Sequence, residues 1–255
     1  MKRSPDQLPR RQYSNKQLRA RSIFSFLVLV ILFASGVLLF NWIKKQPQDN
    51  GAARPLRKAL VLNERFFSSM FDSNRRVREY PVSAAVTNVR VNGMEGLRTG
   101  VDSANWRLKV VRNAGDTLAL TLDEIKALPK KDIVFEFKCI EGWSQVTHWA
   151  GVPFRTFMNA YHLDKEKAMK YIGLQTPDKQ YYVGIDMPSA LQEQTLLCYE
   201  MNGKPLPLNQ GYPLRLIIPV KYGIKHLKRI GTLFFSDSKP PDYWAERGYD
   251  YYSGH

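Results

Sequence analysis

One uninterrupted apolar run constrains what this chain can fold into more than any other feature. Residues 23–43 read IFSFLVLVILFASGVLLFNWI, 21 residues without a charge. A helix rises about 1.5 Å per residue, so the run spans about 30 Å, the thickness of a bilayer's hydrocarbon core. It is longer than the apolar core of a signal peptide, roughly 7–15 residues, and no convincing small-x-small cleavage site follows it. The run therefore predicts an uncleaved transmembrane helix over residues 23–43.

Charge is concentrated around this run. The 255 residues carry a formal charge of +15; nine Lys or Arg and one Asp in residues 1–45 give +8, which leaves +7 for the rest. Seven basic residues precede the run and five follow it within fifteen residues, which favours a cytoplasmic amino terminus and a periplasmic remainder. Arg10 and Arg11 are compatible with a twin-arginine export signal and equally with a chance pair in a basic flank.

After the apolar run, the sequence divides into a linker with a helix and one domain. Residues 46–55 are polar and contain Pro and Gly, which is typical of a linker. Apolar residues then recur at helical spacing over residues 56–71, which predicts an amphipathic helix that packs on the domain rather than on lipid. We expect a basic flank at 1–22, a transmembrane helix at 23–43, a juxtamembrane linker and amphipathic helix at 44–80, and one domain at 81–255.

Within that domain, strands and short helices mix without a βαβ rhythm. Alternating patterns predict strands at 106–111, 133–139 and 214–219. Thr121-x-x-Glu124 is a capping box that opens a short helix, and 153–161 predicts another. Residues 113–116 predict a turn, and Asn202-Gly203 predicts the tip of a hairpin over 195–207. The pattern favours an α+β fold over a doubly wound sheet.

The chain has two cysteines, Cys139 and Cys198. They are too few for a disulfide scaffold, a four-cysteine zinc site or a typical iron–sulfur cluster. Cys139 ends the strand at 133–139, where a scaffold can hold a reactive or metal-binding group in place. By position alone, a single cysteine is more often a small buried apolar residue. A nucleophilic cysteine would also need a base, and the spacing singles out none of the histidines.

Six segments in a fixed order resemble molybdopterin-binding oxidoreductase domains of the sulfite oxidase type, nearer the branch of periplasmic methionine-sulfoxide reductase catalytic subunits. They are WRLKV (106–110), TLDEIKALP (121–129), FKCIEGWS (137–144), HWAGVPF (148–154), LLCYEMNGKPLPLNQGYPLRLIIPVKYGIKHLK (196–228) and PPDYWAERGYDYYSG (240–254). The resemblance covers about residues 85–255 and implies an α+β domain of mixed β-sheets and short helices. It also implies a molybdenum–molybdopterin cofactor, in which one pterin dithiolene and one protein thiolate hold the metal. Cys139 stands in the place of that metal-binding, catalytic thiolate.

The resemblance also implies the residues that bind the cofactor. They are Asn88, Thr176, Gln210, Arg215, His226, Leu227 and Lys228. Arg90 and Asn92 stand in a segment where relatives also contact the pterin, and Tyr249 or Tyr251 would line the substrate channel. Cys198 stands where the family has alanine, so we expect a packed strand residue there. Without the resemblance, the basic residues of 215–228 would be a solvated face; with it, they would form a cationic cradle for the pterin phosphate.

The segment after Cys139 favours one reaction. Sulfite oxidases have arginines there, whereas this chain reads Cys139-Ile-Glu-Gly-Trp-Ser144. We therefore expect a membrane-anchored enzyme that performs two-electron oxygen-atom transfer, the reduction of a small-molecule or protein-bound S-oxide. A membrane cytochrome or a quinone-linked partner would supply the electrons, and no nucleic acid is expected. The alternatives are a sulfite-type oxidase and a non-enzymatic, membrane-tethered basic binding module.

Overall fold

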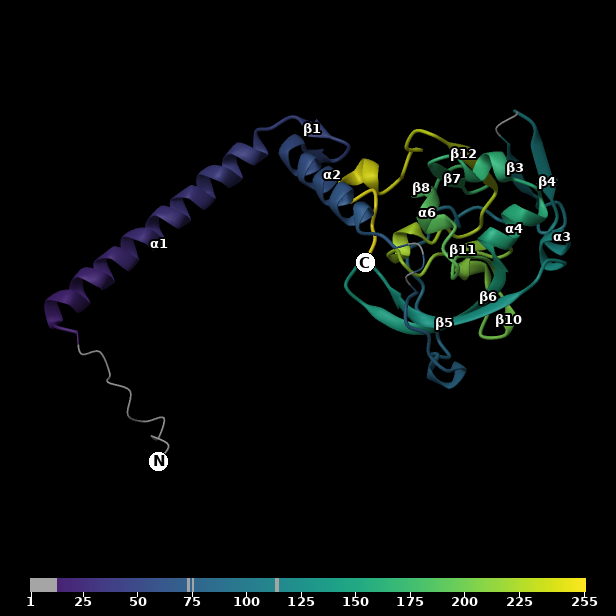
Figure 1. The fold of residues 1–255 in the computed structure, drawn as a ribbon, viewed down its shortest axis with the longest axis horizontal. Coiled ribbons are helices and arrows are strands. Elements are labelled where there is room, and N and C mark those ends of the chain that lie inside the picture. Colours follow the sequence, from purple (N-terminus) through teal and green to yellow (C-terminus); the bar gives the residue numbers. More distant parts are fainter. Residues whose placement is uncertain (1–12, 73, 75, 113–114) are drawn as a thin grey trace. The chain divides into compact units, whose positions relative to one another are not determined.

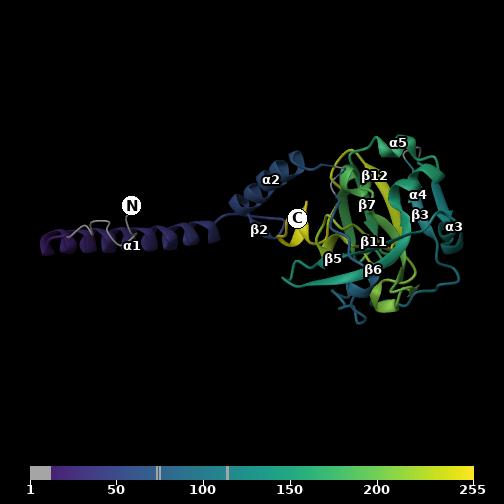
Figure 2. The same cartoon turned by 60° about the horizontal axis from the view of Figure 1, so that its bottom comes forward.

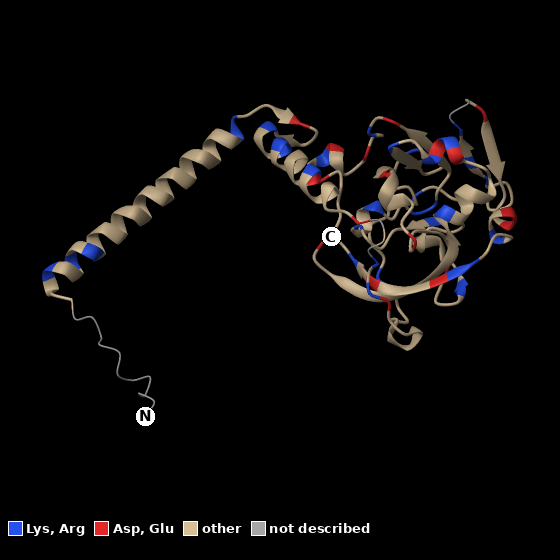
Figure 3. Ribbon diagram, in the orientation of Figure 1, with Lys and Arg blue, Asp and Glu red and all other residues tan. Residues whose placement is uncertain are grey.

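A long helix, α1 (Asn15–Lys44), is the first element of the computed structural model, which describes residues 13–72, 74, 76–112 and 115–255. The Ser14 hydroxyl accepts a hydrogen bond from the Gln17 backbone N–H, and the Gln17 side chain accepts one from the Ser14 N–H, a complete capping box. The predicted apolar run lies inside α1, which is long and apolar enough to cross a membrane. Lys and Arg occur near both of its ends and not in its middle (Figure 3). Arg10, Arg11 and part of the predicted turn at 113–116 lie outside the described residues.

The chain divides into two units, one up to Pro47 and one over Gln48–His255. In the second unit, one sheet has the order β10-β9-β6-β5, with β11 also on β9, and the other has the order β4-β3-β12-β7-β8. The bounds of the strands of the first sheet are β5 (Lys131–Lys138), β6 (Ser144–Pro153), β9 (Leu196–Met201), β10 (Lys204–Pro205) and β11 (Arg215–Ile217). Those of the second are β3 (Leu108–Val111), β4 (Thr117–Leu120), β7 (Tyr171–Gln175), β8 (Tyr182–Asp186) and β12 (Thr232–Ser236). Since β12 pairs parallel with β3 and antiparallel with β7, the predicted mixed sheet is confirmed.

Short helical elements fill the connections of this α+β fold (Figures 1 and 2). The α-helices are α3 (Leu122–Lys126), α4 (Phe154–Ala160), α5 (Asp164–Lys167) and α6 (Met187–Ala190). The 3₁₀ turns are η2 (Val82–Ala84), η3 (Leu208–Gln210), η4 (Gly223–Lys225) and η5 (Ala245–Arg247). The capping box of α3 is present, since the Thr121 Oγ1 accepts from the Glu124 N–H at 3.1 Å. Asn202 (φ 51°) and Gly203 (φ 70°) form the tip of the β9–β10 hairpin, as predicted.

The alternation along β5 places the candidate cysteine. Phe135 and Phe137 point into a core that they share with Trp149 of β6 and with both cysteines, whereas Glu136 and Lys138 stay half-exposed on the other face. β5 pairs with β6 along its whole length, which fixes this register. As a result, the residue that follows β5, Cys139, lies on the buried face at the end of a rigid strand.

The predicted amphipathic helix exists as α2 (Arg54–Ser69), preceded by a small hairpin of β1 (Gln48–Asp49) and β2 (Ala52–Ala53). None of its residues is buried. It is joined to the domain by polar contacts: the Arg57 guanidinium donates to backbone carbonyls, and Glu64 forms an ion pair with Lys239. The expectation that its apolar face packs on the domain is wrong for most of its large apolar side chains, which face solvent; Phe71, just after the helix, does pack against the core.

Candidate functional site

Cys139 occupies the first position of a tight turn that leaves β5. Its backbone N–H donates to the Trp143 carbonyl at 2.9 Å, and its carbonyl accepts from the Gly142 N–H at 3.1 Å. Gly142 has φ 87°, a backbone conformation that glycine adopts without steric cost. Trp143 stacks on Phe137, with ring centroids 5.9 Å apart, which anchors the far side of the turn. The turn therefore presents the Cys139 thiol at a fixed place.

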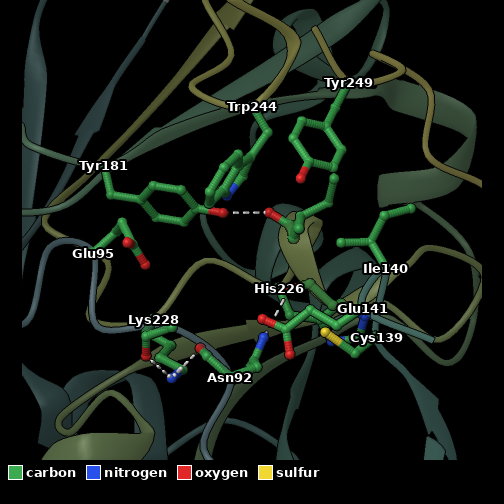
Figure 4. Close-up of a pocket in the computed structure, with 13 residues that line it drawn as sticks. Asn92, Glu95, Cys139, Ile140, Glu141, Tyr181, His226, Lys228, Trp244 and Tyr249 are labelled. Atoms are coloured by element: carbon green, nitrogen blue, oxygen red, sulfur yellow. Dashed lines mark hydrogen bonds between the residues drawn. The ribbon is translucent and has the colours of Figure 1, made fainter. Parts of the chain in front are cut away.

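The thiol lines a cavity built from five separate parts of the chain (Figure 4). Its lining residues are Asn92, Gly93, Glu95, Cys139, Ile140, Glu141, Tyr181, Gly223, Ile224, His226, Lys228, Trp244 and Tyr249. Cys139, Asn92 and Lys228 lie on one side, and the aromatic rings of Trp244 and Tyr249 lie opposite. The Tyr181 hydroxyl donates to the Ile224 carbonyl at 2.6 Å and so joins two of the walls.

Lys228 is a buried cation of the cavity wall. Its Nζ donates to the carbonyls of Asn92, Gly93 and Asn209 at 2.7, 2.9 and 3.3 Å, and no ion pair with a described carboxylate accompanies these bonds. Burial, and then the nearby Arg215 charge, lowers the pKa of Lys228 to about 7. An anionic group placed beside the Lys228 Nζ would stabilise the protonated form.

Arg215 is fully buried in β11, directly opposite Cys198 of β9. Its Nη1 donates to the Gln210 backbone carbonyl at 3.0 Å and to the Gln210 Oε1 at 2.9 Å, and its guanidinium lies 4.5 Å from the centre of the Trp149 ring. Its Nε and Nη2 have no hydrogen-bond partner among the described residues. Burial lowers the pKa of Arg215 to about 10, so it stays charged at neutral pH. A buried cation with two unused donors fits a phosphate-bearing ligand.

The other lysines of the basic segment have different roles. Lys221 forms an ion pair with Asp186 at 2.7 Å, and Lys225 forms one with Asp242. Both lysines are 1% exposed, so the alternative of a solvated basic face is wrong. A single cradle built from the whole segment is also wrong, because these two charges are already compensated. Among the described residues, Lys228 is the cation that lines the cavity; Arg215 and Arg229 are buried outside the lining, and the Arg229 guanidinium already donates to carbonyls.

His226 is held as a neutral imidazole. Its Nε2 lies 3.1 Å from the Lys221 carbonyl and its Nδ1 lies 3.4 Å from the Ile218 nitrogen, so the hydrogen bonds assign the proton to Nε2. Burial lowers the pKa of His226 to about 3. Because both ring nitrogens are hydrogen-bonded to backbone groups, His226 fixes the 218–226 turn and is not a free base. Leu227 is fully buried, and its carbonyl accepts from the Leu216 N–H at 2.9 Å.

This imidazole predicts a loss of stability in acid. The folded pKa of His226, about 3, lies below the unfolded value of about 6.5, so the unfolded chain binds the proton first. Neutral His226 makes its full contribution to the free energy of unfolding above pH 6.5. This contribution falls as the pH drops towards 3, by roughly 2–3 kcal/mol at pH 4.5. Urea unfolding at pH 7 and pH 4.5 measures this, with His226→Gln as the control because glutamine does not titrate. If both proteins lost the same free energy of unfolding between pH 7 and pH 4.5, the assignment to His226 would be contradicted.

Three other residues taken from the resemblance, Gln210, Thr176 and Asn88, lie outside the cavity lining. The Gln210 Nε2 donates to the Val89 carbonyl at 3.2 Å, so Gln210 ties Arg215 to the 89–90 segment. The Thr176 hydroxyl donates to the Asp178 Oδ1 at 2.6 Å and accepts from the Tyr181 N–H; Thr176 does not line the cavity. Asn88 is exposed and also outside the lining. Their roles as cofactor contacts stay predictions.

Several lining residues could not be found from local patterns. Tyr181, Trp244 and Glu95 reach the cavity from segments far apart in the sequence, and no spacing signal connects them to Cys139. Of the two tyrosines expected at a substrate channel, Tyr249 lines the cavity. The other, Tyr251, packs edge-on against Tyr171, and its hydroxyl donates to the Pro240 carbonyl.

The donor set around the thiol tests which metal the site could hold. Among the described residues, no group of three or more His, Cys, Asp or Glu side chains is placed to bind a metal ion. Cys139 would thus be the protein's single soft ligand, and the other ligands would come from a bound organic group. Burial raises the pKa of the Cys139 thiol, and a bound metal would hold it as the thiolate. Three features together fit a metal carried by an anionic dithiolene: the single thiol of the cavity, the two Arg215 donors without a described partner, and Lys228, which forms no ion pair with a described carboxylate.

Comparisons with known proteins agree with this reading. A family model described as the oxidoreductase molybdopterin binding domain matches residues 96–244. A candidate protein-methionine-sulfoxide reductase subunit of Azospira oryzae is 39% identical over 188 residues, which is 72% of this chain and 70% of that protein. The protein-methionine-sulfoxide reductase catalytic subunit of Xanthomonas axonopodis pv. citri is 32% identical over 55% of this chain, and the match spans 48% of that subunit.

A solved structure supports the fold alone. The crystal structure of the sulfane dehydrogenase SoxCD from Paracoccus pantotrophus aligns with a TM-score of 0.50 at 18% identity. The alignment covers 55% of this chain and 40% of that chain. The two sheets and the short helices described above are therefore a known arrangement.

Proposed function

This chain belongs to the oxidoreductase molybdopterin binding domain family, and from that premise we propose that it reduces an S-oxide by two-electron oxygen-atom transfer. It is a molybdopterin-dependent oxidoreductase of the sulfite oxidase type, as the sequence predicted. The observation that carries the proposal is the Cys139 thiol, fixed in a cavity that the buried Lys228 also lines and opposite aromatic side chains.

The chain's own residues would bind and orient the cofactor. Cys139 would be the protein ligand of the molybdenum, and Arg215 and Lys228 would compensate the charge of the pterin phosphate. Gln210 would hold Arg215 in place, and the backbone at Asn92 and Gly93 would fix Lys228. When bound, the cofactor supplies the two-electron redox and oxygen-atom chemistry. The protein contributes position, charge and the exclusion of water.

The cavity supports a neutral substrate over an oxyanion. The turn after Cys139 carries Glu141 and no arginine, and the Glu141 Oε2 accepts from the Trp143 indole N–H at 2.8 Å. Trp244 and Tyr249 form the facing wall. An aromatic wall beside a carboxylate disfavours sulfite and suits the apolar side of a thioether S-oxide. A protein-bound methionine sulfoxide has this chemistry, and the named relatives are protein-methionine-sulfoxide reductase subunits.

The reaction sets what else the site must provide. Reduction of an S-oxide breaks the S–O bond, consumes two electrons and two protons, and releases the thioether and water. The Glu95 and Glu141 carboxyl groups and the Tyr249 hydroxyl line the cavity and could pass those protons. We propose that a membrane cytochrome or a quinone-linked protein supplies the electrons, and that α1 anchors the enzyme with its catalytic domain on the periplasmic side.

Substrate choice tests this proposal. Purified full-length protein in detergent, with a reduced viologen dye as electron donor, should oxidise the dye when methionine sulfoxide is added, free or in a peptide. We expect kcat/KM for S-oxides to exceed that for N-oxides by at least about 10-fold, since pocket contacts discriminate by 1–3 kcal/mol. Sulfite-dependent reduction of ferricyanide should stay at background. Rapid sulfite oxidation without S-oxide reduction would contradict the proposal and favour the sulfite-type alternative.

A further inference from the structure

Most of the large apolar side chains of α2 are exposed, whereas Leu60 and Val61 are half-buried. Its exposed large apolar residues are 47–66% exposed and comprise Leu56, Leu62, Phe66, Phe67 and, just after the helix, Met70. Three exposed basic residues, Arg54, Lys58 and Arg65, belong to the same helix. A helix on the surface of a water-soluble domain normally buries its apolar side. This helix leaves that side open, with cations beside it.

Polar contacts hold the helix in this orientation. The Arg57 Nη2 donates to the carbonyls of Asn50 and Ala245 at 2.5 Å each, and its Nη1 donates to the Tyr249 carbonyl at 3.1 Å. Glu64 and Lys239 form an ion pair at 2.5 Å. Arg57 and Glu64 thus attach one side of α2 to the carboxyl-terminal segment of the domain. The hydrogen bonds of Arg57 and the ion pair of Glu64 thus fix the orientation of α2, so its apolar side chains are not exposed merely because the segment is loosely attached.

The sequence distance from α1 limits where α2 can be. Residues 45–53 alone separate the end of α1 at Lys44 from the start of α2 at Arg54. Nine extended residues reach at most about 30 Å, and the β1–β2 hairpin within them shortens that reach. If α1 crosses a bilayer, the start of α2 stays within this distance of the bilayer surface. In that case, lipid is the molecule closest to the apolar side of α2.

We propose that α2 lies in the membrane interface, with its apolar side at the boundary between headgroups and acyl chains. Arg54, Lys58 and Arg65 would attract the phosphates of anionic lipids. The proposal rests on the proposed membrane anchoring by α1. It has a consequence for the site: Arg57 bonds to the Tyr249 carbonyl, and Tyr249 lines the cavity, so the bilayer-facing helix also supports the cavity wall.

Depth measurements on the full chain test this. The protein is reconstituted into vesicles of three parts phosphatidylcholine to one part phosphatidylglycerol, with the dye NBD on one introduced cysteine. Phe66→Cys probes α2, Leu32→Cys probes α1, and the exposed Lys165→Cys is the solvent control. Both native cysteines are buried, and labelling of the unsubstituted chain checks that they do not react. Lipids that carry a quencher near the end of the acyl chain should quench the dye at residue 32. Lipids that carry it near the headgroup should quench the dye at residue 66 at least about twofold more than the dye at residue 165.

The outcomes separate the two proposals. Quenching of the dye at residue 32 but not at residue 66 overturns the interfacial helix and leaves the anchor standing. No quenching at residue 32 overturns the anchor, and the inference falls with it. Shielding of residue 66 in detergent, without added lipid and dependent on protein concentration, identifies a second copy as the occupant and also overturns the proposal. Lys58→Glu with Arg65→Glu should weaken quenching at residue 66 only in vesicles that contain phosphatidylglycerol.

Discussion

Replacing Cys139 with serine is expected to lower kcat for S-oxide reduction by at least about 10³-fold, because it removes the thiolate that we propose as the protein's ligand to the metal. The side chain is 4% exposed and serine has nearly the same size, so the fold should survive. Dye-linked turnover, with circular dichroism as the check on folding, measures both effects.

Cys198→Ala is the matched control for this experiment. Cys198 is also fully buried, and burial raises its pKa to about 12, so it stays a thiol. It lies in β9, outside the cavity lining, and we expect kcat to change less than about threefold. If Cys139→Ser retained turnover, or if Cys198→Ala lost it to the same degree, Cys139 would not be the catalytic ligand.

The second large effect is expected at Arg215. Replacing it with methionine should reduce the bound cofactor per chain by at least about 10-fold, because the two unused guanidinium donors are lost. The same change leaves two Gln210 oxygens without their donor, but it also removes a buried charge for which the described residues provide no carboxylate, so the free energy of unfolding of cofactor-free protein should fall by no more than about 1–3 kcal/mol. Fluorescence of the oxidised pterin after acid extraction and urea unfolding measure the two quantities.

Arg229→Met provides the contrast for Arg215→Met. Arg229 is also buried, but its guanidinium donates to the carbonyls of Tyr212 at 3.2 Å and Thr99 at 2.7 Å. Its loss leaves those carbonyls unsatisfied and should lower the free energy of unfolding by roughly 1–3 kcal/mol. Arg229→Met should keep most of its bound cofactor, and an equal loss of cofactor in both variants would mean that Arg215 has only a structural role.

Local patterns predicted much of the fold. The alternation of β5, the Thr121–Glu124 box and the Asn202-Gly203 tip depend on neighbours in the sequence, and the structure confirms each. The position of Cys139 at the end of a strand followed from the same alternation. These features need no knowledge of distant contacts, since each hydrogen bond or buried face is set within a few residues.

The rest depended on contacts that no local pattern reveals. Lys221 and Lys225 appeared available to a ligand until the fold brought Asp186 and Asp242 to them. The apolar period of α2 correctly predicted a helix, but the period cannot say which side faces the domain. That was decided by Arg57 and Glu64, whose partners come from the carboxyl-terminal segment.

Counting the sulfur atoms bound to molybdenum tests the central claim most directly. X-ray absorption at the molybdenum edge of the purified full chain should show about three sulfur neighbours, two from one dithiolene and one from Cys139. Cys139→Ser protein that retains the metal should show about two, with an oxygen in the place of the third. An unchanged sulfur count in Cys139→Ser would contradict the account, because the metal would then not be bound by this thiolate.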